Sequence, residues 1–287
     1  MKKLLFQIDT DPIPAVFDTV VAYDGGADHV TAHGGITPDN VGPLVDGTIF
    51  TRSPREKRFT AIFVGGSNLA AGEALLKAVQ KKFFSSFRVS VMLDSNGSNT
   101  TAAAAVACLL KSAGGSLAGQ RAVILAGTGP VGQRAAVMLA KEGVSVAITS
   151  RTLGNAQKAC DHLKAGFGID VTAIEAPDLD SRARACEGAQ VVLATGAASS
   201  VLLRESDWKS NPTIRYMADA NATPPLGIEG MDMMDRGIER DGRICWGAIG
   251  FGAVKLAVHR ACIAQLFEAP DQVLDAEAIY AQAKSMV

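Results

Sequence analysis

The sequence feature that most constrains the fold is a glycine-rich turn made of Gly127, Thr128, Gly129, Pro130, Val131 and Gly132. An apolar run at 122–126 precedes it, as expected of a strand buried on both faces, and a segment with helical spacing at 133–142 follows it. In the order G-x-G-x-x-G, the first glycine permits a tight turn, the second lets the backbone approach a pyrophosphate, and the third allows the helix to pack closely on the strand. Free N–H groups at the helix start then face the phosphates. The turn therefore predicts an α/β fold that binds a dinucleotide.

The end of the next strand indicates which dinucleotide is bound. Folds that bind NAD place an acidic residue about 20 residues after the turn, where it accepts hydrogen bonds from the ribose hydroxyls. Here the strand predicted at 144–149 is followed by Ser150, Arg151 and Thr152, with no acid. A guanidinium can pair with a 2′-phosphate and the two hydroxyls can donate to it, so we expect NADP. The alternative is a solvated arginine after a strand.

Two further loops follow predicted strands of the same sheet. Thr195, Gly196 and Ala197 follow the strand at 190–194, and Asn221 follows the strand at 214–218. Because ligands of a doubly wound sheet lie outside the carboxyl ends of its strands, we expect these residues to contact the cofactor. Ordinary turns between layers are the alternative.

The remainder of the chain also alternates strands with helices. In the N-terminal part we predict strands at 3–8, 60–64 and 88–93 and helices at 14–23 and 69–83. A helix from Ser98 to Lys111, stopped by Gly114 and Gly115, connects to the second part. That part adds a helix at 156–163 and a strand at 171–174, and an amphipathic helix at 273–286 ends the chain.

This alternation predicts an α/β protein with a Rossmann-type doubly wound parallel sheet and a second, smaller α/β domain. Residues 1–100 are expected to form the smaller, substrate-binding domain, completed by 256–287. Residues 101–255 are expected to form the NADP-binding domain together with the connecting helix.

Composition argues against several classes of partner. The chain has 287 residues, a net charge of -1 and 6% aromatic residues, so nothing indicates a surface for nucleic acid. No apolar run approaches the ~20 residues that span a membrane, and Asp9 and Asp11 interrupt the apolar N-terminus too early for a signal peptide. The five cysteines include no C-x-x-C pair, and the four histidines show no metal-binding spacing. We expect a cytoplasmic protein without a metal.

Two segments contain candidate substrate-binding residues. The first is a polar run between a strand and a helix, which could equally cap the helix: Asp94, Ser95, Asn96, Gly97, Ser98, Asn99, Thr100 and Thr101. The second is an apolar, glycine-rich stretch at 247–255 that ends in Lys255. That lysine could hold an anionic or carbonyl group of a substrate, or lie on the surface at the start of a helix.

The motifs of common acid–base and nucleophilic catalysis are absent from the sequence. No G-x-S-x-G and no H-E-x-x-H is present. This pattern favours transfer of a hydride from a carbon that lies between two amine nitrogens. Their lone pairs stabilise the cation that forms, and no proton moves, so the protein mainly has to position two rings.

Six segments together carry a resemblance to a known family. They are 6–11, 23–28, 92–101, 126–132, Asn221 with 224–228, and 259–264. With them the chain resembles, over essentially its whole length, the bacterial NADP-dependent methylene-tetrahydromethanopterin/methylene-tetrahydrofolate dehydrogenases of methylotrophs. The resemblance implies oxidation of the methylene-tetrahydropterin to its methenyl form in one-carbon (formaldehyde) metabolism, and a homo-oligomer, a trimer or hexamer.

The resemblance also assigns roles to individual residues of the substrate site. Lys255 is expected to be the catalytic lysine of the pterin site. The expected substrate-binding residues are Asp9, Asp11, Asp94, Ser95, Asn96, Gly97, Ser98, Asn99, Thr101 and Lys255. Two alternatives stay open: an NADP-dependent reductase similar to shikimate dehydrogenase, and a non-catalytic NADP-binding sensor.

Overall fold

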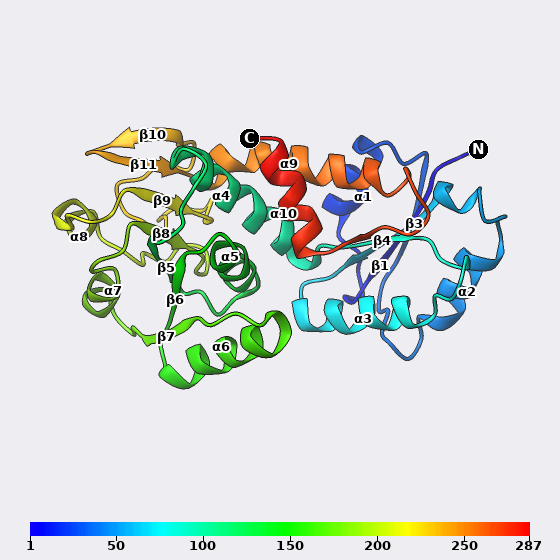
Figure 1. Ribbon diagram of the computed structural model, residues 1–287, viewed down its shortest axis with the longest axis horizontal. Coiled ribbons are helices and arrows are strands. Elements are labelled where there is room, and N and C mark those ends of the chain that lie inside the picture. The colour runs from blue at the N-terminus through cyan, green and yellow to red at the C-terminus, as the bar shows by residue number, and fades with distance from the viewer. The chain divides into compact units, whose positions relative to one another are not determined.

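The computed structural model describes all residues of the chain, Met1–Val287. The chain divides into two compact units (Figure 1). Unit 1 comprises residues 1–100 and 256–286, and unit 2 comprises residues 101–255 with the terminal Val287. Two helices, α4 (Ser98–Ser112) and α9 (Ala248–Gln265), continue from one unit into the other. In chain order, unit 2 is therefore inserted into unit 1.

Unit 1 is built on five parallel strands: β1 (Leu4–Asp9), β2 (His29–His33), β3 (Thr60–Gly65), β4 (Ser90–Leu93) and β12 (Val273–Leu274). They lie in the order β12-β4-β3-β1-β2, so the direction of winding reverses between the neighbours β1 and β3. A reversal of this kind leaves a crevice at the carboxyl ends of the two strands, and ligands of open α/β sheets bind there.

Helices cover both faces of the sheet in unit 1 (Figure 1). α1 (Val16–Asp24) lies on one face, and α2 (Gly42–Phe50) and α3 (Leu69–Lys81) lie on the other. All six residues of β3 are buried, as expected of a central strand of a parallel sheet. Its apolar side chains pack into a core shared with α2 and α3 that includes Ile8, Val45, Ile62, Val64, Leu75 and Val91.

Unit 2 contains a seven-stranded sheet: β5 (Arg121–Leu125), β6 (Ser145–Ser150), β7 (Thr172–Glu175), β8 (Val191–Ala194), β9 (Tyr216–Asp219), β10 (Arg236–Arg240) and β11 (Arg243–Trp246). The strands lie in the order β10-β11-β9-β8-β5-β6-β7, and all pairs are parallel except β10 with β11. Without β10 this is the strand order 3-2-1-4-5-6 of a dinucleotide-binding fold. The predicted fold class is confirmed.

The helices of unit 2 also lie on two faces. α5 (Pro130–Lys141) and α6 (Leu153–Phe167) cover one face, and α7 (Leu179–Ala185) and α8 (Glu205–Ser210) cover the other (Figure 1). The core beneath α7 and α8 includes the buried Trp208 together with Val192, Ile214 and Met217. None of the chain's helices combines the length and apolar character that crossing a bilayer requires.

The structure differs from the sequence prediction at the C-terminus. A single helix was expected at 273–286, but Val273 and Leu274 pair with β4 as strand β12, and the helix α10 is Ala276–Ser285. Asp275 separates the two elements because its carboxylate accepts hydrogen bonds from Glu277 N (3.0 Å) and Ala278 N (3.1 Å) and caps the helix.

A second difference concerns Lys255. The alternative interpretation of the sequence placed Lys255 on the surface at the start of a helix, but α9 already begins at Ala248. The glycine-rich stretch before Lys255 is therefore helical, and the lysine lies inside the helix, one turn before His259.

Candidate functional site

The glycine turn lies between β5 and α5, and its three glycines have different surroundings. A Cβ at Gly127 would lie 2.9 Å from the Ile148 side chain, and a Cβ at Gly132 would lie 2.6 Å from the Gly127 Cα atom. A Cβ at Gly129 would meet nothing within 4 Å. Gly132 thus allows α5 to approach the strand, while Gly129 leaves open space beside the first N–H groups of the helix, where a phosphate can approach.

The turn itself departs from the predicted role of the first glycine. The residue with positive φ is Ala126 (φ 52), not Gly127, so Gly127 is needed for space rather than for its conformational freedom. Thr149 holds the two strand ends together, because its Oγ1 accepts from Ala126 N at 2.9 Å and its carbonyl accepts from Gly127 N at 3.1 Å. This places the turn beside the end of β6.

A cavity of about 300 Å³ lies at the carboxyl ends of β5, β6 and β8. Among the predicted cofactor-binding residues, it is lined by Thr128, Ser150, Arg151, Gly196 and Ala197. The other lining residues are Ala126, Thr149, Asn155, Ala176, Arg182, Ser200 and Leu202. The lining includes two arginines and no carboxylate, so the cavity favours an anion.

Three other predicted cofactor-binding residues do not line this cavity and form local hydrogen bonds instead. Thr152 caps α6, since its hydroxyl accepts from Asn155 N at 3.4 Å. Thr195 Oγ1 donates to the Leu125 carbonyl oxygen at 3.2 Å and lies 2.7 Å from the position of a Cβ at Gly132. The buried Asn221 donates through Nδ2 to the Pro225 carbonyl oxygen at 3.2 Å.

Asp219 organises the loop that contains Asn221. Its carboxylate accepts from Asn221 N at 3.0 Å and from Ile228 N at 2.8 Å. Burial raises the pKa of Asp219, and the backbone hydrogen bonds from Asn221, Ile228 and Gly227 oppose that shift. Asp219 therefore works as a fixed acceptor that holds the loop.

Arg182, Asn155 and Ser200 line the cavity but were not predicted from the sequence. Arg182 lies on α7, beyond the third strand, and the sequence contains no motif that links this position to the glycine turn. Only the strand order, which brings β7 next to β6, places it beside Arg151.

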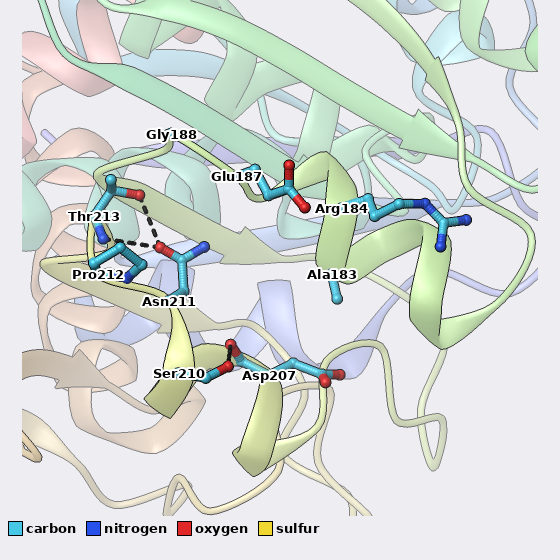
Figure 2. Close-up of a pocket in the computed structure, with 9 residues that line it drawn as sticks. All are labelled: Ala183, Arg184, Glu187, Gly188, Asp207, Ser210, Asn211, Pro212 and Thr213. Atoms are coloured by element: carbon cyan, nitrogen blue, oxygen red, sulfur yellow. Dashed lines mark hydrogen bonds between the residues drawn. The ribbon is translucent and has the colours of Figure 1, made fainter.

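A second cavity, of about 410 Å³, lies near the amino ends of β8 and β9 (Figure 2). Its lining includes Arg184, Glu187, Asp207 and Asn211, and the Asn211 side-chain oxygen accepts from Thr213 N at 2.9 Å. None of the predicted site residues lines this cavity, and it lies at the strand ends where open α/β sheets do not bind their ligands.

The edge of the sheet in unit 1 also gathers predicted site residues. Asp9, at the end of β1, accepts from Asp11 N at 2.9 Å and from Ala15 N at 3.2 Å. Asp11 accepts from Ser67 N at 2.9 Å and from Ser67 Oγ at 3.0 Å. Ser67 follows β3, so these contacts join the two strands at which the winding of the sheet reverses. Asp9 is buried, whereas Asp11 is only partly buried.

The polar run after β4 is mostly engaged in capping. The fully buried Asp94 carboxylate accepts from Asn99 N at 2.8 Å, Thr100 N at 3.1 Å and Thr100 Oγ1 at 2.6 Å. Ser98 Oγ donates to the Ser95 carbonyl oxygen at 2.7 Å. The geometry favours the capping interpretation for Asp94, Ser95, Ser98 and Asn99, which are all buried. Asn96 is exposed, and Gly97 and Thr101 are partly exposed, so these three can reach a ligand.

Lys255 and His259 lie on neighbouring turns of α9. Lys255 is partly buried. His259 is buried, its ring stacks on Phe63 with centroids 5.5 Å apart, and its Nδ1 atom lies 3.9 Å from Asp94 Oδ2. His259 thus places α9 against β3 and the end of β4 within unit 1.

Comparison with known proteins shows the family. Residues 16–96 match the family model described as methylene-tetrahydromethanopterin dehydrogenase, N-terminal. The chain is 56% identical to the bifunctional protein MdtA of Methylorubrum extorquens over 99% of each chain. It is 31% identical to an NAD(P)-dependent methylenetetrahydromethanopterin dehydrogenase of the same organism, over 89% of this chain and 88% of the relative. The chain belongs to the methylene-tetrahydromethanopterin dehydrogenase family. The family predicted from the sequence is confirmed, and with it the enzyme class, an oxidoreductase.

Solved structures with a similar fold include other dehydrogenases. Shikimate 5-dehydrogenase from Listeria monocytogenes, in complex with shikimate and NAD, superposes with a TM-score of 0.54 and 12% identity over 97% of this chain and 95% of its own. At this identity the likeness concerns the fold alone. It agrees with the Rossmann-type sheet of unit 2.

The cysteines of this dehydrogenase-family chain are all free and buried. Burial raises the pKa of the Cys108 thiol to about 11 and that of Cys186, Cys245 and Cys262 to about 12. Thiolates are therefore not formed near neutral pH, and these side chains pack as small apolar groups. No group of three or more histidine, cysteine, aspartate and glutamate side chains is placed to hold a metal ion.

Proposed function

We propose that the chain is an NADP-dependent dehydrogenase that oxidises 5,10-methylene-tetrahydromethanopterin, 5,10-methylene-tetrahydrofolate or both to the methenyl form. Unit 2 binds the dinucleotide. The proposed pterin-binding residues belong to unit 1, except Thr101 and Lys255, which are the first and last residues of the 101–255 stretch. One-carbon metabolism in the cytoplasm and a homo-oligomeric state belong to the same proposal. The names of the two relatives and of the family model support the reaction.

The observation that carries the cofactor assignment is the cavity at the carboxyl ends of β5, β6 and β8. Its wall contains Ser150 and Arg151, and no carboxylate that could accept from a ribose 2′-hydroxyl. A 2′-phosphate would instead pair with the guanidinium. The pyrophosphate would lie against the open backbone at Gly129 and the start of α5.

The substrate side of the proposal rests on the reversal of winding between β1 and β3. The ring of a tetrahydropterin carries an amino group and ring N–H groups that donate hydrogen bonds. The partly buried Asp11 carboxylate accepts such bonds, and each of its oxygens has a second lone pair besides the one used by Ser67. Asn96, Gly97, Thr101 and Lys255 complete the residues proposed to contact the substrate.

The proposed chemistry is transfer of a hydride. The C–H bond of the methylene carbon breaks with its electron pair, and NADP⁺ when bound supplies the acceptor and becomes NADPH. The cation that remains is delocalised over the two adjacent nitrogens, so no side chain has to accept a proton. The chain's own residues hold the rings in place, and Lys255 influences the charge around the reacting ring.

The test is a spectrophotometric assay with purified protein, NADP⁺ and either methylene-tetrahydropterin. We expect NADPH and the methenyl product to appear together, and slower reaction with NAD⁺. Arg151→Glu should weaken NADPH binding by about tenfold to 100-fold. Lys255→Ala should slow turnover while NADPH binds as before.

Four outcomes contradict the proposal. No product with either pterin would rule out the reaction, and turnover of shikimate would favour the reductase alternative. Tight NADPH binding with no turnover of any substrate would favour the sensor alternative. Unchanged NADPH binding in Arg151→Glu would remove the basis for assigning NADP.

A further inference from the structure

The cavity at the carboxyl ends of β5, β6 and β8 contains a second cation that the proposed function does not use. Arg182 lies at the fourth position of α7 and lines the same wall as Arg151. Apart from Arg151, the other lining residues are neutral, and they include Asn155 and Ser200, whose side chains can donate hydrogen bonds. An anion that entered this cavity would meet two guanidinium groups and no opposing carboxylate.

The chain holds the Arg182 guanidinium in a fixed place. Its Nε donates to the Ala176 carbonyl oxygen at 3.2 Å and its Nη2 to the Pro177 carbonyl oxygen at 2.9 Å. Its Nη1 lies 3.5 Å from the Val201 carbonyl oxygen. All three acceptors are neutral carbonyls, and a guanidinium has five N–H donors, so two remain for a ligand.

Arg182 lies near a carboxylate and near a second guanidinium. Burial is the main cause that lowers its pKa, the charge of Asp178 opposes that shift, and the charge of Arg151 lowers the pKa by a smaller amount. The Asp178 carboxylate is itself engaged as the cap of α7, where it accepts from Ser181 N at 2.8 Å. Two like charges that are held close together without a bridging carboxylate repel each other, and a bound dianion between them would relieve that repulsion.

We propose that Arg182 is a second contact for the adenosine 2′-phosphate and, with Arg151, determines the preference for NADP over NAD. This inference rests on the proposed function, because it assumes that the cavity takes the adenosine end of the dinucleotide. Arg151 approaches from the loop after β6, and Arg182 approaches from α7, so the phosphate would be bound from two sides. Because carbonyl oxygens already hold the Arg182 guanidinium in place, the side chain loses little conformational entropy when the phosphate binds, and this favours affinity.

The test compares Arg182→Gln with the wild type and with a matched control, Arg184→Gln. The control removes the same charge from the same helix, but Arg184 is exposed and lines the second cavity (Figure 2). Dissociation constants are measured by calorimetry for NADPH, NADH, adenosine 2′-phosphate and adenosine. In Arg182→Gln we expect NADPH and adenosine 2′-phosphate to bind about tenfold or more weakly, while NADH and adenosine change little. Arg184→Gln should bind all four as the wild type does.

Two results overturn the inference. Equal weakening of NADPH and NADH would mean that Arg182 supports the adenine or the cavity wall rather than the phosphate. Unchanged binding of all four would mean that Arg182 does not touch the ligand. A wild type that binds NADPH no better than NADH would contradict the proposed function instead, so the two failures are distinguishable.

A measurement on the wild type covers the case in which Arg182→Gln does not fold. Arginines are modified with phenylglyoxal, and the modified positions are read by mass spectrometry. Adenosine 2′-phosphate should protect Arg151 and Arg182 but not Arg184, and adenosine should protect none of the three. Equal modification of Arg182 with and without adenosine 2′-phosphate would refute the inference.

Discussion

At the scale of single residues, Gly129 and Gly132 show how one motif combines two different requirements. A Cβ at Gly132 would lie 2.6 Å from both the Cα and the carbonyl oxygen of Gly127, so backbone would have to move. A Cβ at Gly129 would project into open space. Gly132 therefore serves the fold, and Gly129 leaves room for the ligand.

Alanine at each position should separate these requirements. Gly132→Ala should destabilise the protein by about 1–3 kcal/mol, because an added methyl group in a packed interface forces backbone shifts. Gly129→Ala should leave the free energy of unfolding nearly unchanged and weaken NADPH binding, because the methyl group would occupy space beside the pyrophosphate. Urea denaturation and NADPH titration of both variants check this.

A Gly129→Ala variant that binds NADPH like the wild type would place the pyrophosphate elsewhere. A Gly132→Ala variant as stable as the wild type would show that α5 can move away from the strand at little cost. Gly154→Ala serves as a control, since a Cβ there meets nothing within 4 Å and the residue lies outside the cavity lining.

Residues of the cavity were predictable from sequence where a local motif carries the information. The glycine turn and Arg151 belong to one strand–turn–helix–strand unit, so their spacing along the chain already relates them. Arg182 reaches the same wall because β7 pairs with β6. The Asn221 side chain is held within its own loop by its hydrogen bond to the Pro225 carbonyl oxygen. No local sequence motif indicates either arrangement.

At the scale of secondary structure, Asp94 illustrates how a buried carboxylate can start a helix. It accepts hydrogen bonds from Asn99 N, Thr100 N and Thr100 Oγ1, which belong to the first turn of α4. The first N–H groups of a helix lack partners within it, and a negative charge at that end is favourable. These contacts account for Asp94, Asn99 and Thr100 without a ligand.

Removal of the Asp94 cap should lower the free energy of unfolding. Asp94→Ala should lower the free energy of unfolding by about 2 kcal/mol, as for loss of a strong N-cap. Asp94→Asn keeps an acceptor oxygen and should recover part of that loss. Both are measured by urea denaturation, with pterin KM determined on the folded protein.

A different result would return Asp94 to the substrate site. If Asp94→Asn were as stable as the wild type but showed a pterin KM raised about tenfold or more, its charge would serve the ligand rather than the helix. The capping interpretation predicts instead a lower free energy of unfolding and little change in the pterin KM. Thr101→Ala, at a partly exposed position nearby, should affect KM more than stability.

The sequence predicted those elements in which periodicity or apolar character is strong. It missed β2 and α2, because β2 has no fully buried residue and α2 contains Gly42, Pro43 and Gly47. It also missed β12, since Val273 and Leu274 continue the apolar spacing of the following helix. Only the free edge of β4, distant in sequence, makes a strand of these two residues.

At the scale of the whole molecule, the C-terminal segment completes unit 1. Val91 N donates to the Gln272 carbonyl oxygen at 2.8 Å, and β12 covers the edge of β4. Leu274, Ile279 and Ala283 are buried. Burying a leucine or isoleucine side chain contributes about 1.5–3 kcal/mol, a large share of the stability of a typical domain.

Deletion of residues 271–287 should therefore loosen unit 1 and leave unit 2 folded. Both tryptophans of the chain, Trp208 and Trp246, lie in unit 2, so their fluorescence reports on that unit alone. We expect native tryptophan emission together with rapid hydrogen exchange in β4 and aggregation through its exposed edge.

The control is deletion of Met286 and Val287 only, beyond the end of α10, which should behave like the wild type. Protected β4 amides in the longer deletion would show that unit 1 is stable without its fifth strand. Loss of native tryptophan emission would show that the two units unfold together.

The insertion of unit 2 into unit 1 has a consequence for synthesis on the ribosome. Unit 2 is a single uninterrupted stretch of chain apart from Val287, so it can fold while translation continues. Residues 1–100 of unit 1 are synthesised before unit 2, yet the β4 edge stays uncovered until Val273 and Leu274 of β12 have been added. The nascent N-terminal segment thus keeps an open strand edge while all of unit 2 is made, the state in which a chaperone would be most needed.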